Sequence, residues 1–363
     1  MSTATAYFAN TYTGSRENFH QACSQAGIDV DHYIHPLLGI DDEELATDVA
    51  RIGPVDAETV IILTSATHGV EGFGGSGIQV GMLLDKNGPK LPIGTALLLI
   101  HGVNPFGFSW CRRVNEDNVD MNRNFVDHAG NNYPENELFE LLYPHAVPKR
   151  WQESDFLECN KQLDLLANEH GAVPVRKALT KGQYFHPDSV HFGGQKASWS
   201  NETLYKICQK ELVNAKQGIL IDLHTGLGPY GYGELMTPAK PGEAVFDRLF
   251  DWFGDEVHST TAGSSNYAGS KGSVLAGFRP GSDNLEWTSV GLEFGTLDQK
   301  TVSHAMRGDI WVYVHGDPQS PLGDDIRTLV RDAFYVDEDK WKQMLWERGR
   351  EVIERVIEGL PQS

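Results

Sequence analysis

A histidine and a glutamate stand three residues apart in a glycine-rich stretch of the chain, at the end of an apolar segment. These residues are His68 and Glu71. Imidazole nitrogens and carboxylate oxygens both bind zinc, so the pair is a candidate for part of a metal site. The pair alone is a weak signal, because Glu71 would equally suit the N-terminal end of a following helix and His68 would then be an ordinary loop histidine.

A second histidine, His224, follows Asp222 in another apolar segment. Side chains two residues apart on a strand project to the same side, so Asp222 is placed to contact the ring of His224. An aspartate in this position fixes the ring of a metal-binding histidine, although an internal Asp–His pair without a metal is the alternative.

Two histidines and one carboxylate form a ligand set that binds zinc and leaves a fourth position for water. We therefore predict that His68, Glu71 and His224 hold one zinc ion. The sequence also allows a second metal ion near the first, because His101 and Asp222 are further ligand candidates.

Glu293 stands near the end of an apolar segment, where a carboxylate is costly to bury unless it is functional or paired. We predict that it is the general base that takes a proton from the attacking water; a buried salt bridge is the alternative.

Arg112, Arg113 and Arg123 cluster in one turn-rich stretch. Hydrolysis by an activated water builds negative charge on the carbonyl oxygen, so a fixed cation is expected nearby. The alternative is that these arginines only keep the surface soluble.

Short apolar segments alternate with amphipathic ones along the chain. Strands are predicted at 59–66, 95–102, 217–226 and 288–296, and their continuous apolar character is typical of strands covered on both faces. Helices are predicted at 74–86, 201–215, 243–254, 299–313 and about 337–359, with Ser200 or Asn201 as N-cap of the second. This alternation predicts a layered α/β domain with a mixed, mostly parallel sheet. Ligands bind at the carboxyl ends of strands in such sheets, which is where the candidate residues fall.

The composition narrows the class of protein. The 363 residues are 40% hydrophobic and 22% charged, with a formal net charge of −20, which argues against a nucleic-acid partner. We predict one catalytic domain over 1–363, with an insertion over the core at about 126–200, where the strand pattern is weakest. The start of the sequence lacks a signal-peptide pattern, and no apolar run reaches the roughly 20 residues that cross a bilayer.

Four cysteines are scattered through the chain without a closely spaced pair, at positions Cys23, Cys111, Cys159 and Cys208. This spacing disfavours a disulfide framework or a thiolate zinc site and favours a reducing cytoplasm. Cys111 is predicted to be an incidental thiol rather than a nucleophile.

The candidate motifs together resemble the zinc carboxypeptidase family. The resemblance extends over roughly 59–300 and rests on motifs in matching order: His68/Glu71, Asn104–Gly107, Arg113, Asp120–Phe125, His224 and Glu293. The whole chain most resembles a bacterial branch of that family catalogued as a domain of unknown function. The resemblance implies an eight-stranded twisted sheet between helices.

The resemblance also implies a role for each matching residue. Glu293 would act as general base and then acid, while His68, Glu71 and His224 would hold the zinc. Arg113 would polarise the scissile carbonyl. Asn122 and Arg123 would bind the terminal carboxylate of a substrate, and Tyr267 looks like the mobile tyrosine that closes over it.

The implied activity is zinc-dependent hydrolysis of an amide bond next to a free carboxylate, most simply that of a carboxypeptidase on peptides. The sequence DLHTG at 222–226 is closer to aspartoacylase and succinylglutamate desuccinylase, so a deacylase of N-acyl amino acids is the alternative. A non-catalytic zinc- or peptide-binding protein is a second alternative. The sequence determines neither the side-chain preference nor the oligomeric state.

Overall fold

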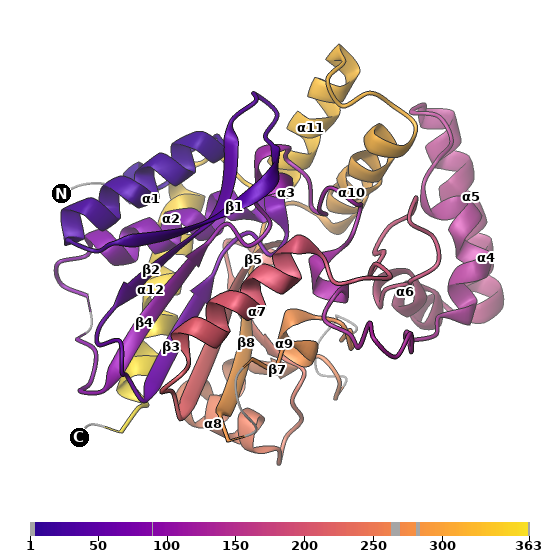
Figure 1. The fold of residues 1–363 in the computed structure, drawn as a ribbon. Helices are drawn as coiled ribbons and strands as arrows, with labels where there is room; N and C mark the ends of the chain where they lie inside the picture. Colours follow the sequence, from indigo (N-terminus) through magenta and orange to yellow (C-terminus); the bar gives the residue numbers. More distant parts are fainter. Residues whose placement is uncertain (1–3, 89, 263–268, 281–283, 362–363) are drawn as a thin grey trace.

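An eight-stranded sheet forms the centre of the computed structural model, which describes residues 4–88, 90–262, 269–280 and 284–361 (Figure 1). The strands are β1 (Val30–Leu38), β2 (Glu44–Ile52), β3 (Thr59–Thr64), β4 (Thr95–His101), β5 (Gln217–Tyr230), β6 (Gly233–Thr237), β7 (Val257–Ser259) and β8 (Glu286–Gly295). Their order is β1-β2-β4-β3-β5-β8-β6-β7. Strands β4, β3, β5 and β8 run parallel, β6 and β7 are also parallel, and the other three pairs are antiparallel. The predicted mixed, mostly parallel sheet is confirmed.

The four strands predicted from the sequence are the four central ones. Along β3, Ile61 and Leu63 pack into the apolar core on one face of the sheet, whereas Val60 and Ile62 pack into the core on the other. Both faces are therefore covered, and this explains why these strands are apolar at successive positions. The other four strands went unpredicted. β1, at one edge, is mostly exposed and lacks such a run.

Helices cover both faces of the sheet. One layer consists of α1 (Tyr12–Ala26), α2 (Gly72–Leu84), α8 (Ala244–Phe253), α10 (Gln299–Val314), α11 (Pro321–Phe334) and α12 (Asp339–Glu358). The opposite layer consists of α7 (Trp199–Glu211) and α9 (Val274–Gly277), and α7 crosses the front of the sheet in Figure 1. The shorter helices are η1 (Ala4–Tyr7), η2 (Gly69–Glu71), α3 (Pro105–Ser109), η3 (Met121–Arg123) and η4 (Gly254–Glu256).

Helix α7 begins earlier than predicted. Its N-cap is Ser198, whose extended backbone precedes the helix and whose side chain accepts a hydrogen bond from the backbone N–H of Asn201. The prediction of Ser200 or Asn201 as N-cap was wrong, because both lie in the first helical turn.

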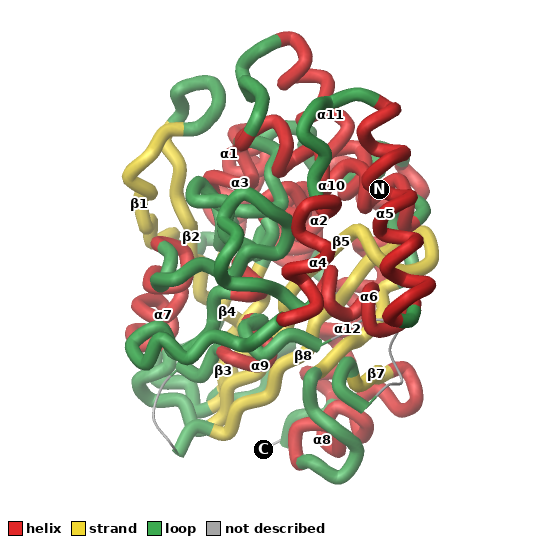
Figure 2. Tube along the Cα trace, turned by 90° about the vertical axis from the view of Figure 1, so that its right-hand side faces the viewer, coloured by secondary structure: helices red, strands yellow, loops and turns green. Residues whose placement is uncertain are grey.

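The segment 126–200 contains three helices and none of the named strands. Helices α4 (Glu137–Ala146), α5 (Glu153–His170) and α6 (Ala172–Thr180) lie together at one side of the sheet (Figures 1 and 2). They share a small apolar cluster of Leu142, Val175 and Ala178. The weak strand pattern of this segment thus corresponds to a helical unit beside the sheet.

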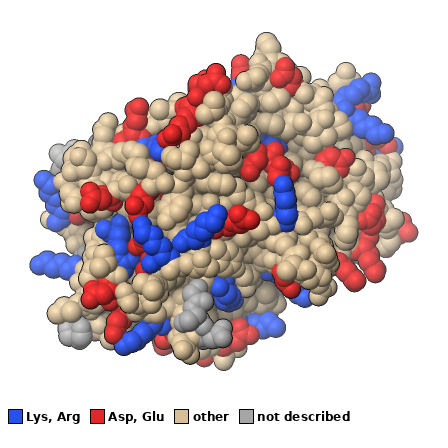
Figure 3. All heavy atoms as spheres, in the orientation of Figure 1, with Lys and Arg blue, Asp and Glu red and all other residues tan. Residues whose placement is uncertain are grey.

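The surface carries acidic and basic side chains together. Acidic groups are numerous along the right-hand edge of Figure 3, where α4 to α6 lie in Figure 1. None of the helices in the described parts of the chain is long and apolar enough to cross a membrane. All four cysteines have free thiols, and burial raises the pKa of Cys111 to about 11, so its thiol is protonated near neutral pH.

Candidate active site

The strand order brings the candidate residues to one edge of the sheet. Strand β5 lies between β3 and β8, so the loop after β3, which carries His68, runs beside the end of β5. His224 on β5 is the direct register partner of Glu293 on β8. Paired residues on neighbouring strands project from the same face, so these two side chains lie side by side. Residues far apart in the sequence therefore meet at the carboxyl ends of parallel strands.

The glycines around His68 allow the loop to lie directly against a second loop. A Cβ atom on Gly69 would lie 2.0 Å from the backbone carbonyl carbon of Gly107, so only glycine fits there. Backbone N–H groups of Gly69 and Val70 donate to the carbonyls of Arg113 and Arg112, at 3.2 and 2.8 Å. This contact fixes the two loops against each other, and it brings the arginine-bearing loop to His68.

His68, Glu71 and His224 form a compact, buried cluster. One oxygen of Glu71 lies 2.9 Å from Nδ1 of His68, and the other lies 2.8 Å from Nδ1 of His224. One candidate ligand atom from each of the three residues lies within 4.8 Å of the others. The predicted convergence of these three side chains is therefore present in the structure.

An aspartate holds the second nitrogen of each histidine. Oδ1 of Asp120 lies 3.1 Å from Nε2 of His68, and Oδ2 of Asp222 lies 2.6 Å from Nε2 of His224. Because an ionised carboxylate only accepts hydrogen bonds, Asp120 and Asp222 each fix a proton on Nε2, and a metal ion between Nδ1 and Glu71 would take the place of a proton there. Metal-binding histidines are oriented in this way.

The charges around the cluster favour a bound cation. Among the residues that the structure describes, Arg113 is the one lysine or arginine within ion-pair distance of the buried carboxylates Glu71, Asp120 and Asp222. Burial raises the pKa of Glu71, but His68 and His224 outweigh it and hold the pKa well below its ordinary value. Burial lowers the pKa of His224, but the carboxylates of Asp222 and Glu71 raise it well above its ordinary value. A divalent cation would supply the positive charge that this site favours, so the donor set fits zinc.

Two neighbouring arginines have different environments. Arg113 donates to Glu71 at 2.8 Å and to Asp120 at 3.4 Å, and it lines the cavity beside the cluster. Arg112 is buried, donates to Asp309 at 2.8 Å, and lies over the ring of Tyr313. The sequence placed both arginines in one group, but Arg112 packs against α10 and Arg113 faces the site.

Glu293 is buried at the same cavity, with 6% of its surface exposed. Its Oε1 accepts a hydrogen bond from the backbone N–H of Leu227 at 3.1 Å. Burial, reinforced by the negative charge of Glu71, raises the pKa of Glu293 above its ordinary value. The carboxyl has no lysine or arginine ion-pair partner among the described residues, so the salt-bridge alternative finds no partner there.

Asn122 and Arg123 both line the cavity, but they face different neighbours. The side-chain amide of Asn122 lies 3.2 Å from Nε2 of His224. Arg123 is buried, and its guanidinium donates to the backbone carbonyls of Asn122 and Thr180, at 2.8 and 2.5 Å. Arg123 is therefore held by the end of α6. Tyr267 lies outside the described residues.

His191 is a cavity-lining residue that the sequence did not single out. Its Nδ1 lies 3.1 Å from Oδ2 of Asp120, so one aspartate contacts both His68 and His191. The backbone of His191 has φ +55°, which is rare for a residue other than glycine and is a feature found at functional sites. No local sequence signal marks His191, because its partner lies 71 residues away.

The candidates for a second ion at this site do not join the cluster. Nε2 of His101 forms a hydrogen bond with the hydroxyl oxygen of Ser76 at 2.9 Å, and the His101 ring stacks on Phe19 in the core. Asp222 contacts His224 and accepts hydrogen bonds from Thr64 and Thr67 at 2.6 and 2.7 Å. Both therefore have other partners, and Asp222 orients the ring of His224.

The cluster opens into a cavity of about 490 Å³. His68, Glu71, Arg113, His224 and Glu293 line its polar end. Apolar side chains from the helices beside the sheet line another part, including Leu163 of α5, Val175 of α6 and Met306 of α10. The segment 126–200 thus contributes directly to the walls of the candidate active site.

A family model described as "Protein of unknown function (DUF2817)" matches residues 8–348. The chain belongs to this family. No curated protein matches it significantly. Similar solved structures include carboxypeptidase A from Helicoverpa armigera, at 11% identity over 89% of this chain and 74% of that one, with a TM-score of 0.42.

Two further solved structures are similar at the same low level. Murein-tripeptide amidase MpaA from Escherichia coli O157 has 17% identity over 80% of this chain and 93% of that one, with a TM-score of 0.36. Succinylglutamate desuccinylase from Chromobacterium violaceum has 14% identity over 84% and 74%, with a TM-score of 0.35. The match to a family of unknown function agrees with the branch that the sequence motifs resemble.

Proposed function

We propose that this protein is a zinc-dependent hydrolase that cleaves an amide bond next to a free carboxylate. The observation that carries the proposal is the buried cluster of His68, Glu71 and His224 beside Glu293. A binding protein has no need of a buried carboxyl with a raised pKa next to its metal ligands, whereas a hydrolase needs a base there. This difference favours an enzyme over a non-catalytic zinc- or peptide-binding protein.

His68, Glu71 and His224 would hold the zinc ion, which would supply a Lewis acid and lower the pKa of a water molecule at the site to about 7. Glu293 accepts the proton of the attacking water and returns it to the leaving amine. Arg113 donates to the carbonyl oxygen as negative charge develops there. Asp120 and Asp222 keep the two imidazole rings in the required tautomer and orientation.

Recognition of the substrate carboxylate is assigned to Asn122 and Arg123, which line the cavity next to the cluster. Arginine presents a planar set of donors that matches a carboxylate. Nε of Arg123 is buried and lacks a hydrogen-bond partner in the described structure. We also assign Tyr267 to the closing of the site, as the family resemblance implies.

The preferred substrate is a peptide, and the activity that of a carboxypeptidase in the cytoplasm. A deacylase of small N-acyl amino acids is the second candidate, which the DLHTG sequence favours. The apolar wall formed by α5, α6 and α10 suits an apolar side chain or acyl group in either substrate.

The proposal is tested with zinc-loaded protein and two substrate panels. One panel holds peptides of several residues with different C-terminal amino acids, and the other holds short N-acyl amino acids. Release of C-terminal amino acids from peptides supports the carboxypeptidase, whereas cleavage confined to the second panel supports the deacylase. Amidation of the C-terminal carboxylate should abolish cleavage in both panels.

The variant Glu293→Gln separates an enzyme from a binding protein. We expect it to keep stoichiometric zinc and to lose about 10²- to 10⁴-fold in kcat/KM, the usual contribution of general acid–base catalysis. An unchanged rate would remove Glu293 from the mechanism. If the protein binds zinc but hydrolyses no substrate of either panel, the result would support a zinc-binding protein without catalytic activity.

A further inference from the structure

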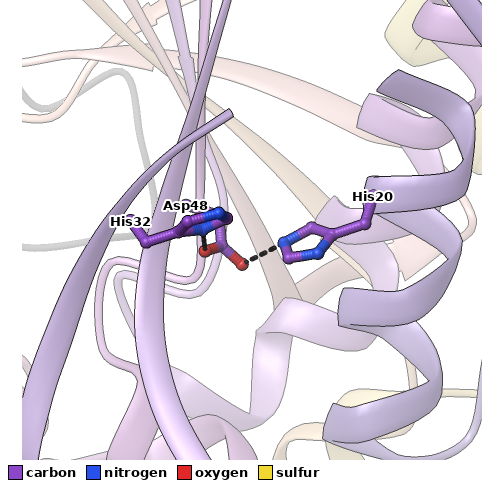
Figure 4. Close-up of side chains that lie close together, drawn as sticks. All are labelled: His20, His32 and Asp48. Atoms are coloured by element: carbon purple, nitrogen blue, oxygen red, sulfur yellow. Dashed lines mark hydrogen bonds and ion pairs between the residues drawn. The ribbon is translucent and has the colours of Figure 1, made fainter. Parts of the chain in front are cut away.

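A second group of histidines and a carboxylate lies apart from the cavity. His20 belongs to α1, His32 to β1 and Asp48 to β2, and none of the three lines the candidate active site. His32 and Asp48 are direct register partners on neighbouring antiparallel strands. Helix α1 packs over this face of the sheet, so three separate elements converge on one carboxylate (Figure 4).

Both histidine rings contact the same carboxylate through different oxygens. Nε2 of His20 lies 2.9 Å from Oδ2 of Asp48, and Nδ1 of His32 lies 2.7 Å from Oδ1. The Asp48 side chain is fully buried, whereas the side chains of His20 and His32 are 36% and 43% exposed. An ion from solvent therefore has access to the imidazoles on one side of a fixed, buried carboxylate.

This arrangement repeats the one at the candidate active site. There too, nitrogens of two histidines lie 2.8–2.9 Å from the two oxygens of a single carboxylate, that of Glu71. These two groups are the potential metal sites among the described residues. They differ in access, because His68 and His224 are buried and His20 and His32 are half-exposed.

We propose that His20, His32 and Asp48 bind a divalent transition-metal ion of the type that imidazole favours, with zinc as the first choice. The ion would connect α1 to strands β1 and β2 at the edge of the sheet. Its site is independent of the proposed hydrolase activity.

Arg16 also contacts Asp48 and is compatible with the ion. Its Nε lies 2.7 Å from Oδ2 and its second terminal nitrogen lies 3.2 Å from Oδ1. A carboxylate offers about four lone-pair positions, so it can accept from a guanidinium and bind a metal together. In the candidate active site Arg113 likewise donates to the carboxylate of Glu71, through one nitrogen at 2.8 Å.

Binding requires only a small adjustment of the two histidines. Zinc–nitrogen and zinc–oxygen bonds of about 2.0–2.1 Å in a tetrahedron separate ligand atoms by about 3.3 Å. The present nitrogen–oxygen distances are 2.7 and 2.9 Å, each to a different oxygen of Asp48, and one ligand atom from each residue lies within 4.8 Å of the others. Both rings would therefore turn toward a common ion, which replaces their hydrogen-bonded protons. Half-exposed side chains can make this movement without repacking the core.

The test counts zinc per chain after dialysis, by elemental analysis, for wild type and for the double variant His20→Ala/His32→Ala. We expect the double variant to hold one ion fewer. The same pair of substitutions is then made in a His68→Ala/His224→Ala background. The background variant should hold one ion, and the variant that also lacks His20 and His32 should hold none. Cobalt substitution in this background should give the visible absorption of a tetrahedral site, and circular dichroism should show that each variant is folded.

The variant His170→Ala serves as the control. His170 is 33% exposed beside Glu169 and resembles His20 in exposure, but it belongs to neither potential metal site among the described residues. In the His68→Ala/His224→Ala background it should keep the remaining ion. The proposal is overturned if that background holds no ion, or if removal of His20 and His32 leaves the count unchanged. Loss of the ion in the His170→Ala control would also overturn it. Because the two sites are counted separately, a failure at the active site does not affect this result.

Discussion

The carboxylate of Asp222 lies 2.6 Å from Nε2 of His224, two residues further along β5. Its other oxygen accepts hydrogen bonds from Thr64 and Thr67, so the aspartate is fixed from the neighbouring strand and the loop that follows it. The ring of His224 is thereby held with Nδ1 toward Glu71. The position of a candidate ligand atom thus depends on a residue that does not itself contact the ion.

We expect Asp222→Asn to weaken zinc binding about 10- to 100-fold, the usual cost of removing a carboxylate that supports a ligand histidine. In this variant the side-chain oxygen would still accept from Thr64 and Thr67, so the NH2 group would face Nε2 of His224. Two hydrogen-bond donors would then face each other, and the ring would lose its support. Competition with a fluorescent chelator measures the change. As a control, Asp309→Asn alters a buried aspartate that contacts Arg112 and the backbone N–H of Arg113 but none of the three cluster residues, and zinc affinity should change little. Equal affinity in Asp222→Asn and wild type would contradict the assignment.

Arg113 should contribute to catalysis, whereas Arg112 should contribute to the stability of the fold. Arg113→Ala is expected to lower kcat about 10²- to 10³-fold, as when one donor to the developing oxyanion is lost. Arg112→Ala leaves the buried Asp309 without its ion-pair partner and should lower the free energy of unfolding by about 3–5 kcal/mol. Urea unfolding and kcat per zinc-loaded molecule separate the two effects. A larger loss of kcat in Arg112→Ala would reverse the assignment.

The fall of kcat/KM at acid pH, the acid limb of the pH profile, should reflect protonation of Glu293. A carboxyl must be ionised to accept a proton, so kcat/KM should rise with pH through the pKa of this group. Burial and the charge of Glu71 raise that pKa above the ordinary value, so the limb should lie at higher pH than for an exposed glutamate. A carbon-13 NMR titration of labelled glutamate, with Glu293→Gln to assign the signal, measures the pKa directly. An ordinary or lowered value would contradict the expected limb.

His191 should contribute to substrate binding. Asp120 is ionised, because Arg113 and Arg123 among others outweigh burial and hold its pKa well below the ordinary value. Burial lowers the pKa of His191 to about 4, so the ring is neutral at pH 7 with its proton on Nδ1. Nε2 is then an acceptor for an N–H or O–H group of the substrate.

The variant His191→Asn keeps a residue that tolerates positive φ and can still donate to Asp120. Loss of one neutral hydrogen bond should raise KM about 3- to 10-fold and leave kcat nearly unchanged. The control is His128→Asn, which changes a histidine that contacts the carbonyl of Asn124 and does not line the cavity. Equal KM values for the His191 and His128 variants would exclude the contact.

The sequence was sufficient to predict the central strands, because a strand buried on both faces must be apolar at successive positions. Strands β3, β4, β5 and β8 follow this rule, and their predicted bounds differ from the observed ones by at most four residues. The edge strand β1 contacts solvent and obeys no such rule, so its sequence gave no comparable signal. Helices α4 to α6 were not predicted, because the segment 126–200 was recognised only as an insertion with a weak strand pattern.

For the site, the sequence determined residue types and local spacings: His68 with Glu71, Asp222 with His224, and Glu293 at the end of a strand. These are properties of single segments, whose geometry follows from the period of a strand or a turn. Tertiary structure alone decided that β5 lies between β3 and β8, that Arg113 faces the cluster and Arg112 does not, and that His191 contacts Asp120. Such contacts depend on strand order and on loop packing between distant segments, and no local pattern of residues contains that information.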